Sequence, residues 1–204
     1  MKVAIIGTGN VGGALAKAWS RAGHHIILGV RDVANFKGTA LLAEENIEAD
    51  TIISATAKAE IILIAAAPQA IIEIIKAMGN VSGKIIIDAM NSIRTKPEGY
   101  NTTFEAIKDL CGDAEVVKCF NSTGFENMQN PIYNGKGLDM FVAGNSTKGK
   151  EIATQLALDA GFEKCYDFGG DEKTALLEQL AFCWINLAIM QGLGRDIAFQ
   201  IVKR

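Results

Sequence analysis

Six residues near the amino terminus have the types and spacing of a phosphate-binding turn. The segment Gly7-Thr8-Gly9-Asn10-Val11-Gly12 follows an apolar run at residues 3–6 and precedes a helical pattern at residues 10–22. In such a unit the first glycine permits a tight turn, the second admits a diphosphate, and the third lets the helix pack closely. Free N–H groups and the helix dipole favour negative charge there. The six residues therefore predict a dinucleotide site, although close packing could also explain the glycines.

The end of the next apolar run bears on which dinucleotide binds. NAD sites usually carry an acidic residue about 20 residues after the glycines, whereas an arginine there accommodates the 2′-phosphate of NADP. Here the run ends in Leu28-Gly29-Val30-Arg31-Asp32. Arg31 could bind a phosphate through two parallel hydrogen bonds. Asp32 could instead bind a ribose, or cap the following helix. The arginine favours NADP, and NAD is the alternative.

Short β-branched runs alternate with helical patterns along most of the chain. The runs are apolar throughout rather than alternating, as in strands that are buried on both faces. This predicts a Rossmann-type, doubly wound, mostly parallel sheet in residues 1–168, with a C-terminal helical extension in residues 169–204. Strands are expected at residues 3–6, 25–28, 51–53, 61–66, 85–88, 116–119, 140–143 and 164–168, and helices at 10–22, 36–46, 69–78, 104–110, 147–160 and 172–190.

The last predicted helix is apolar on nearly every side over residues 182–190. Such a helix must be buried on every side. We therefore predict that it packs on the same unit, as a pocket wall, or on a partner subunit in a homodimer. Glu178 and Asn186 lie on this helix, and could line the pocket or pair across the dimer.

Composition excludes several classes of function. The formal net charge is −3, which gives no electrostatic reason to expect nucleic acid or an anionic membrane as a partner. Four cysteines without a C-x-x-C pair and only two histidines make a poor metal site, so no metal is predicted. Free thiols suit a reducing cytosol. No apolar stretch reaches the roughly 20 residues of a membrane span, so a soluble, cytoplasmic protein is expected.

These motifs resemble one family. The glycine turn, the Ala22-Gly23-His24 turn and the Leu28–Arg31 tip are similar to NADPH-dependent oxidoreductases of the deazaflavin coenzyme F420, to which the cytosolic domain of the STEAP ferric reductases is related. The resemblance continues through residues 116–123, Leu177-Glu178 and Gly192-Leu193-Gly194. It implies hydride transfer between a nicotinamide and a second redox ring. Val30 departs from the family, which commonly has a serine there to bind the 2′-phosphate.

The resemblance also implies a pocket. Ala66, Ala67, Pro68, Asn91 and Asn121 would contact the cofactor, and Ser92, Ser122 and Thr123 would line the substrate pocket. The two asparagines could equally serve only to form turns.

Hydride transfer between rings requires positioning more than acid–base chemistry, so no catalytic residue is predicted. The sequence leaves the acceptor open between a deazaflavin, a flavin, a quinone and a small carbonyl compound. A non-catalytic NADP(H) sensor and a small imine or carbonyl reductase are the alternatives.

Overall fold

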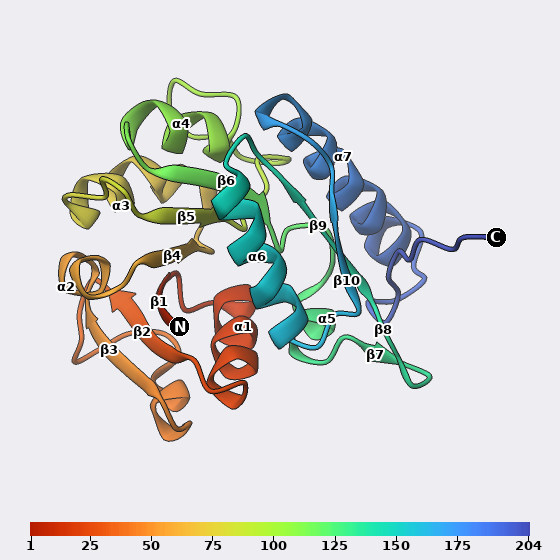
Figure 1. Ribbon diagram of the computed structural model, residues 1–204, viewed down its shortest axis with the longest axis horizontal. Coiled ribbons are helices and arrows are strands. Elements are labelled where there is room, and N and C mark those ends of the chain that lie inside the picture. The colour runs from red at the N-terminus through yellow and green to blue at the C-terminus, as the bar shows by residue number, and fades with distance from the viewer.

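One eight-stranded sheet forms the centre of the molecule (Figure 1) in the computed structural model, which describes residues 1–204. Its strands are β1 (Lys2–Ile6), β2 (His25–Val30), β3 (Ile47–Thr51), β4 (Ile61–Ile64), β5 (Ile85–Asp88), β6 (Glu115–Cys119), β9 (Asp139–Ala143) and β10 (Lys164–Asp167). They stand in the order β10-β9-β6-β5-β4-β1-β2-β3. From β3 to β6 all neighbours are parallel, so their carboxyl ends share one edge. The order reverses between β1 and β4, where open α/β sheets bind ligands.

Helices cover both faces of this sheet. Successive residues of a strand point to opposite sides, so uninterrupted apolar strands make both faces apolar. Ile5 and Leu28 belong to one core, and their neighbours Ile6 and Ile27 belong to the other. This arrangement confirms the predicted doubly wound, Rossmann-type fold. The first core is covered by α1 (Asn10–Arg21) and α6 (Thr147–Asp159), and the second by α2 (Ile52–Lys58), α3 (Ile71–Met78) and α4 (Thr103–Leu110).

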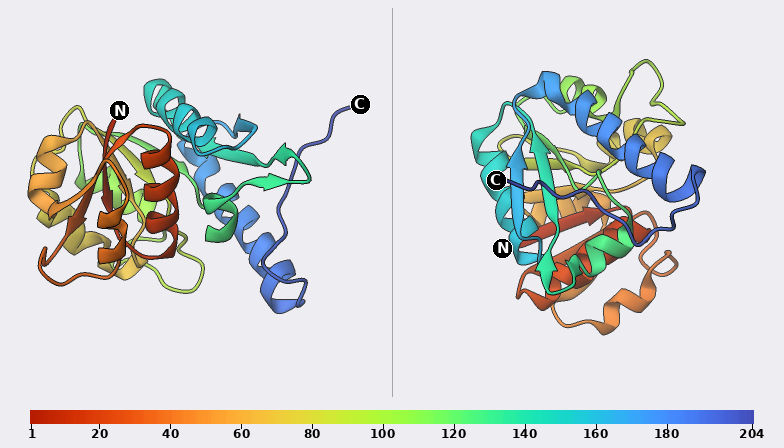
Figure 2. Two further views of the ribbon diagram at one scale, coloured as in Figure 1. Left: turned by 90° about the horizontal axis from the view of Figure 1, so that it is seen from below. Right: turned by 90° about the vertical axis from the view of Figure 1, so that its right-hand side faces the viewer.

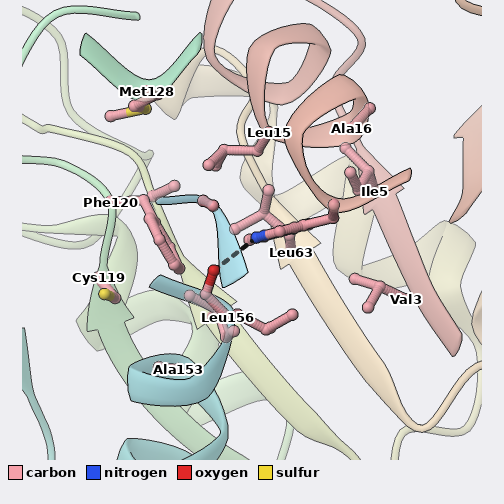
Figure 3. Packing of buried hydrophobic residues seen from close by; sticks show 14 of the residues in the cluster. Val3, Ile5, Leu15, Ala16, Leu63, Cys119, Phe120, Met128, Ala153 and Leu156 are labelled. Carbon is pink, nitrogen blue, oxygen red and sulfur yellow. Dashed lines mark hydrogen bonds between the residues drawn. The ribbon is translucent and has the colours of Figure 1, made fainter. Parts of the chain in front are cut away.

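Trp19 joins three elements in the first core, part of which Figure 3 shows. Its indole N–H donates to the carbonyl oxygen of Leu156 in α6 at 2.8 Å. Its ring meets Phe120 edge to face, with centroids 5.4 Å apart and planes at 76°. The side chain is fully buried, and removing such a tryptophan costs about 3–5 kcal/mol. The core thus reaches from α1 to the residue that follows β6.

The last two strands run against the others. β9 pairs antiparallel with β6, and β10 then pairs parallel with β9. The outward face of β9 carries Phe141 and Ala143, which pack with Leu177 of α7 (Thr174–Ile185). Helix α7 therefore lies beside this end of the sheet (Figure 1).

Within one subunit the last helix is buried on one side only, and whether a partner subunit covers the other side stays a prediction. Leu177, Ala181 and Trp184 face the protein, whereas Leu176 is 52% exposed and Phe182 is 38% exposed. No element of the chain covers the outer face of α7. The helix ends at Ile185 and continues into a wider π turn over Asn186–Met190.

The predicted helix at residues 36–46 is wrong. A loop occupies residues 31–38, and only a short 3-10 turn follows at Thr39–Ala43. Gly38 enters that turn with a φ of 101°, a left-handed conformation that ends any regular helix there.

The strand expected at residues 51–53 begins and ends earlier, as β3. Thr51 caps the next helix instead, because its hydroxyl accepts a hydrogen bond from the Ser54 N–H at 3.3 Å.

Smaller elements complete the chain. Helix α5 (Phe125–Gln129) and the hairpin β7 (Ile132–Tyr133) and β8 (Lys136–Gly137) lie between β6 and β9. After α7 the chain turns back and runs past that hairpin (Figure 2), where Gln200 bonds the carbonyl of Gly137 at 3.3 Å. None of the helices is both long and apolar enough to cross a bilayer.

Candidate active site

The three glycines of the phosphate turn differ in what a side chain would meet at each position. Gly7 has a φ of 103°, and a Cβ there would lie 2.4 Å from the carbonyl oxygen of Ala65. A Cβ on Gly12 would lie 2.0 Å from the carbonyl oxygen of Gly7. A Cβ on Gly9, in contrast, would have no atom within 4 Å. Gly7 and Gly12 are thus required by the fold, whereas the bare backbone at Gly9 faces open space.

The N-terminus of α1 opens onto that space. Gly9 is the N-cap, so no side chain satisfies the first N–H groups, and the first turn holds no acidic residue. Unpaired N–H groups at the start of a helix attract anions. The protein therefore offers these donors to a ligand, as a diphosphate would require.

A larger cleft of about 860 Å³ lies on one side of this turn. Its walls are the ends of β1, β2 and β4, with the loop at residues 31–38 beyond them. The Thr8 hydroxyl donates to the carbonyl of Lys37 and ties that loop to the turn. Arg31 forms no ion pair within the chain, so its guanidinium is available to a ligand. Lining residues include Gly7, Thr8, Gly9, Arg31, Asp32, Asn35, Phe36, Lys37, Ala66 and Ala67.

Asp32 shares the cleft with Arg31 but is already engaged. Its carboxylate accepts a hydrogen bond from the Ala34 N–H at 2.9 Å, which closes a local turn. The sequence left two roles open for Asp32, binding a ribose or capping a helix. This hydrogen bond is a local cap, but it caps a turn and not a helix.

A smaller pocket of about 410 Å³ lies on the other side of the α1 N-terminus. Phe125 and Trp184 give it aromatic walls, and Arg94 and Arg195 are its only charged residues. Arg195 is paired with Glu126, whereas Arg94 forms no ion pair. The pocket is lined by Asn10, Val11, Asn91, Ile93, Arg94, Thr95, Asn121, Thr123, Gly124, Phe125, Ala181, Trp184, Ile185, Ile189 and Arg195.

Asn91 and Asn121 bind each other at the edge of the smaller pocket. The Asn91 side-chain amide donates to the Asn121 carbonyl at 2.8 Å, and the Asn121 amide donates back to Asn91 Oδ1 at 2.9 Å. The Asn121 amide also lies 3.2 Å from the carbonyl of Leu177 in α7. Asn121 Oδ1 is buried and has no hydrogen-bond partner. A buried acceptor left unpaired costs about 1–3 kcal/mol, so a ligand that donated to it would be favoured.

The residue before Asn121 has an unusual backbone. Phe120 follows β6 with a φ of 60°, a left-handed conformation that is rare for a bulky side chain. Such conformations persist only where the surroundings enforce them, and they cluster at functional sites. Here the edge-to-face contact with Trp19 holds the Phe120 ring in the core. The turn at Phe120 therefore directs the chain from the core to the pocket.

A buried charge cluster, consisting of Asp88, Lys118 and Glu178, lies beneath the two asparagines. Lys118 is fully buried on β6, and its Nζ lies 2.9 Å from Asp88 Oδ2 and 2.9 Å from Glu178 Oε1. Burial alone would lower the pKa of Lys118, but the two carboxylates outweigh it and raise that pKa above its usual value. Glu178 therefore pairs with Lys118 inside the subunit, and does not line the pocket.

Most of the expected site residues lie along the two cavities, but some do not. Ser92 and Ser122 were expected to line the substrate pocket, and both are buried outside its lining. The Ser92 hydroxyl accepts from the Thr103 N–H at 3.0 Å, and the Ser122 hydroxyl lies 3.9 Å from the sulfur of Met140. The other expected residues that line neither cavity are Gly12 and Pro68.

Sequence reasoning missed Lys37, Arg94, Phe125 and Arg195, whereas the expected pocket wall at residues 182–190 is present in Trp184, Ile185 and Ile189. A basic residue close to Arg31 was a usable signal for Lys37, but the loop was interpreted as helix. Arg94 comes from a loop, Phe125 from the start of α5 and Arg195 from the C-terminal segment, whose return to the pocket no local pattern indicates.

Residues 2–92 match the family model for the coenzyme F420-dependent NADP oxidoreductases. The match covers less than half of the chain, and over these residues the chain is similar to that family. The similarity supports an NADP-dependent oxidoreductase with NADP(H) at its dinucleotide site. The matched residues hold the phosphate turn, the Arg31 tip and Asn91.

Solved structures extend the similarity to the whole chain. A protein of Arthrobacter sp. FB24 proposed to be an F420-dependent NADP reductase is 26% identical, with a TM-score of 0.85 over all of both chains. A hypothetical protein of Sinorhizobium meliloti is 23% identical, with a TM-score of 0.73, covering this chain fully and 96% of its own.

A reductive aminase of Aspergillus terreus, solved with NADPH4, cyclohexanone and allyl amine, is 20% identical with a TM-score of 0.70. The match covers 94% of this chain and 62% of the aminase, and it shows the fold. No curated protein matches the sequence. The relation to the STEAP reductases stays a prediction.

Proposed function

We propose that the protein transfers hydride between NADP(H) and a second redox ring, a deazaflavin or a flavin, that binds in the smaller pocket. The observation that carries this proposal is the position of the two cavities. Gly9 lines the larger cleft and Asn10 the smaller pocket, so the cavities meet at the N-terminus of α1. A dinucleotide whose diphosphate sits at that helix end would extend one half into each cavity.

The residues of the chain fit such a ligand. Unpaired N–H groups and the open space at Gly9 would hold the diphosphate. Arg31 and Lys37 would hold the 2′-phosphate at the far end of the larger cleft. Asn121 Oδ1, a buried acceptor without a partner, is suited to the carboxamide of the nicotinamide. When bound, NADPH supplies the hydride, and the protein supplies the orientation.

The lining of the smaller pocket favours a ring acceptor over an imine or a carbonyl compound. Reduction of C=O or C=N needs a proton donor within hydrogen-bond reach of the substrate. No aspartate, glutamate, histidine, lysine, tyrosine or cysteine lines this pocket. Phe125 and Trp184 instead offer aromatic surfaces against which a planar ring packs. Transfer between two stacked rings depends on that positioning.

An acceptor panel tests the proposal. The protein is incubated with NADPH and, separately, with a deazaflavin, a flavin, a quinone, ferric iron and cyclic imines or ketones, while nicotinamide absorbance is followed. Faster NADPH oxidation with the deazaflavin or the flavin than with the others is expected. Turnover of imines or ketones alone would favour the reductase alternative. Tight NADPH binding without turnover of any acceptor would favour the sensor.

We also propose that the protein acts in the cytosol as a homodimer, and that residues 169–204 form an extension of the same unit. All four cysteines are free, in keeping with a reducing compartment. The exposed apolar face of α7 and its π turn, defined here as Leu176, Phe182, Ile189 and Met190, offers a surface for a second copy.

A further inference from the structure

Both peptide units that flank Asn91 are held by the buried charge cluster. Asp88 Oδ1 accepts from the Met90 N–H at 2.9 Å, and Lys118 Nζ donates to the Met90 carbonyl at 2.8 Å. On the other side, Glu178 Oε2 accepts from the Ser92 N–H at 3.0 Å. The backbone on either side of Asn91 therefore has little freedom.

The same cluster connects three elements behind the smaller pocket. Asp88 ends β5, Lys118 lies on β6, and Glu178 lies on α7. Thr103, at the start of α4, donates its hydroxyl hydrogen to Asp88 Oδ2 at 2.8 Å. Lys118 thus donates to Asp88 and to the Met90 carbonyl, and its ammonium lies at ion-pair distance from Glu178 Oε1, which accepts no hydrogen bond.

Stability alone is a poor reason for such a cluster. Taking charges out of water costs several kcal/mol per ion, and apolar side chains of similar volume are often as stabilising as a buried ion pair. What a buried network of ion pairs and hydrogen bonds provides is one defined geometry. In this protein the geometry ends at the asparagine pair, because Asn91 binds Asn121 and Asn121 binds the carbonyl of Leu177, next to Glu178.

We propose that Asp88, Lys118 and Glu178 are positioning residues that fix the Asn91–Asn121 pair against the nicotinamide half of the cofactor. This inference rests on the proposed function, since it requires a dinucleotide across both cavities. The cluster acts only on the smaller pocket, because none of its contacts reaches the larger cleft. Loss of the cluster should therefore affect one half of the cofactor and not the other.

Two ligands allow binding of the nicotinamide half and of the adenosine half of the cofactor to be measured separately. NADPH occupies both cavities, whereas adenosine 2′,5′-bisphosphate carries the adenosine and the 2′-phosphate but no nicotinamide. In Glu178→Gln the single amide oxygen cannot accept from both Lys118 and the Ser92 N–H, so one contact is lost. We expect NADPH affinity, measured by calorimetry, to fall about tenfold, equivalent to one hydrogen bond of about 1.4 kcal/mol. Affinity for the bisphosphate should stay within about twofold, an energy difference below RT.

Glu105→Gln is the matched control. Glu105 also accepts a backbone N–H, that of Asn101 at 2.9 Å, but it lies outside both cavities. Both ligands should bind this variant as they bind the wild type. Should Glu178→Gln fail to fold, Thr103→Val removes one hydrogen bond to Asp88, with an expected selective loss of about threefold in NADPH affinity.

The outcomes are distinct. The positioning role is overturned if a folded Glu178→Gln or Thr103→Val variant keeps the wild-type ratio of the two affinities, whether both are unchanged or both fall equally. If the wild type binds neither ligand, the proposed function itself fails.

Discussion

The guanidinium of Arg195 lies over the indole ring of Trp184, with Cζ 5.2 Å from the ring centroid. The Trp184 indole N–H donates to the carbonyl of Ile197 at 2.6 Å, so the two residues fasten the C-terminal segment to α7. Glu126 of α5 holds the guanidinium from the other side, at 2.5 Å and 2.9 Å. One wall of the smaller pocket is therefore assembled from α5, α7 and the C-terminal segment.

Acid should release this wall. The hydrogen bond from Arg195 holds the pKa of Glu126 below its usual 4.5, because the ionised carboxylate is the better acceptor. The stabilising effect is thus fully present above pH 4.5 and is lost as the pH falls through the lowered value. Trp184 fluorescence should change reversibly in that range. In Glu126→Gln this change should be missing, and its persistence would assign the transition to another group.

Replacement of Arg31 should discriminate between the two nicotinamide coenzymes. Arg31→Ala removes a charged donor from the larger cleft, and hydrogen bonds to charged groups contribute about 1.5–3 kcal/mol. We expect NADPH affinity to fall about tenfold to hundredfold, with little change for NADH. Titration calorimetry measures both. Arg21→Ala, which removes an exposed arginine at the other end of α1, is the control. Equal losses for NADPH and NADH would remove Arg31 from phosphate recognition.

Two glycines of the phosphate turn should separate binding from folding. Gly9→Val places its side chain in open space, so the melting temperature should hardly change, but the valine would occupy the place of the diphosphate. Gly12→Ala places Cβ 2.0 Å from the Gly7 carbonyl oxygen, and such overpacking costs about 1–3 kcal/mol of stability. Thermal unfolding and NADPH titration of both variants test this contrast. A Gly9→Val protein that binds NADPH normally contradicts the proposed site.

The proposed dimer should depend on the exposed face of α7. Phe182→Arg introduces a charge on that face, and light scattering should show a shift from dimer to monomer at low micromolar concentration. Ile53→Arg is matched to it, because Ile53 is 60% exposed on α2, away from α7. A wild-type protein that is monomeric, or a Phe182→Arg variant that stays dimeric, would exclude this interface.

Local patterns predicted the sheet and its first turn well. Val3, Ile5 and Leu63 lie in uninterrupted apolar runs, which predict strands covered on both faces, and they are buried in the structure. The glycine turn needs only the sequence around it, since Gly7 and Gly12 contact each other within one strand–helix connection.

Contacts between distant segments account for what the sequence could not predict. Lys118 resembled an ordinary strand residue, and its partners lie 30 and 60 positions away. Ser92 and Ser122 follow strands, as site residues do. Their hydroxyls nevertheless contact Thr103 and Met140 inside the protein and do not face the pocket. Finally, an apolar helix pattern predicts that the helix is buried, but it does not identify the surface against which the helix packs.

The left-handed backbone at Phe120 links the design of the core to the design of the pocket. A glycine at position 120 would relieve the torsional cost but would leave a hole against Trp19, whereas a larger core partner would press on the same peptide. Neither change stays local, because the next residue is Asn121. Anyone re-engineering this scaffold for another acceptor would therefore have to transplant Trp19 and Phe120 together with the pocket.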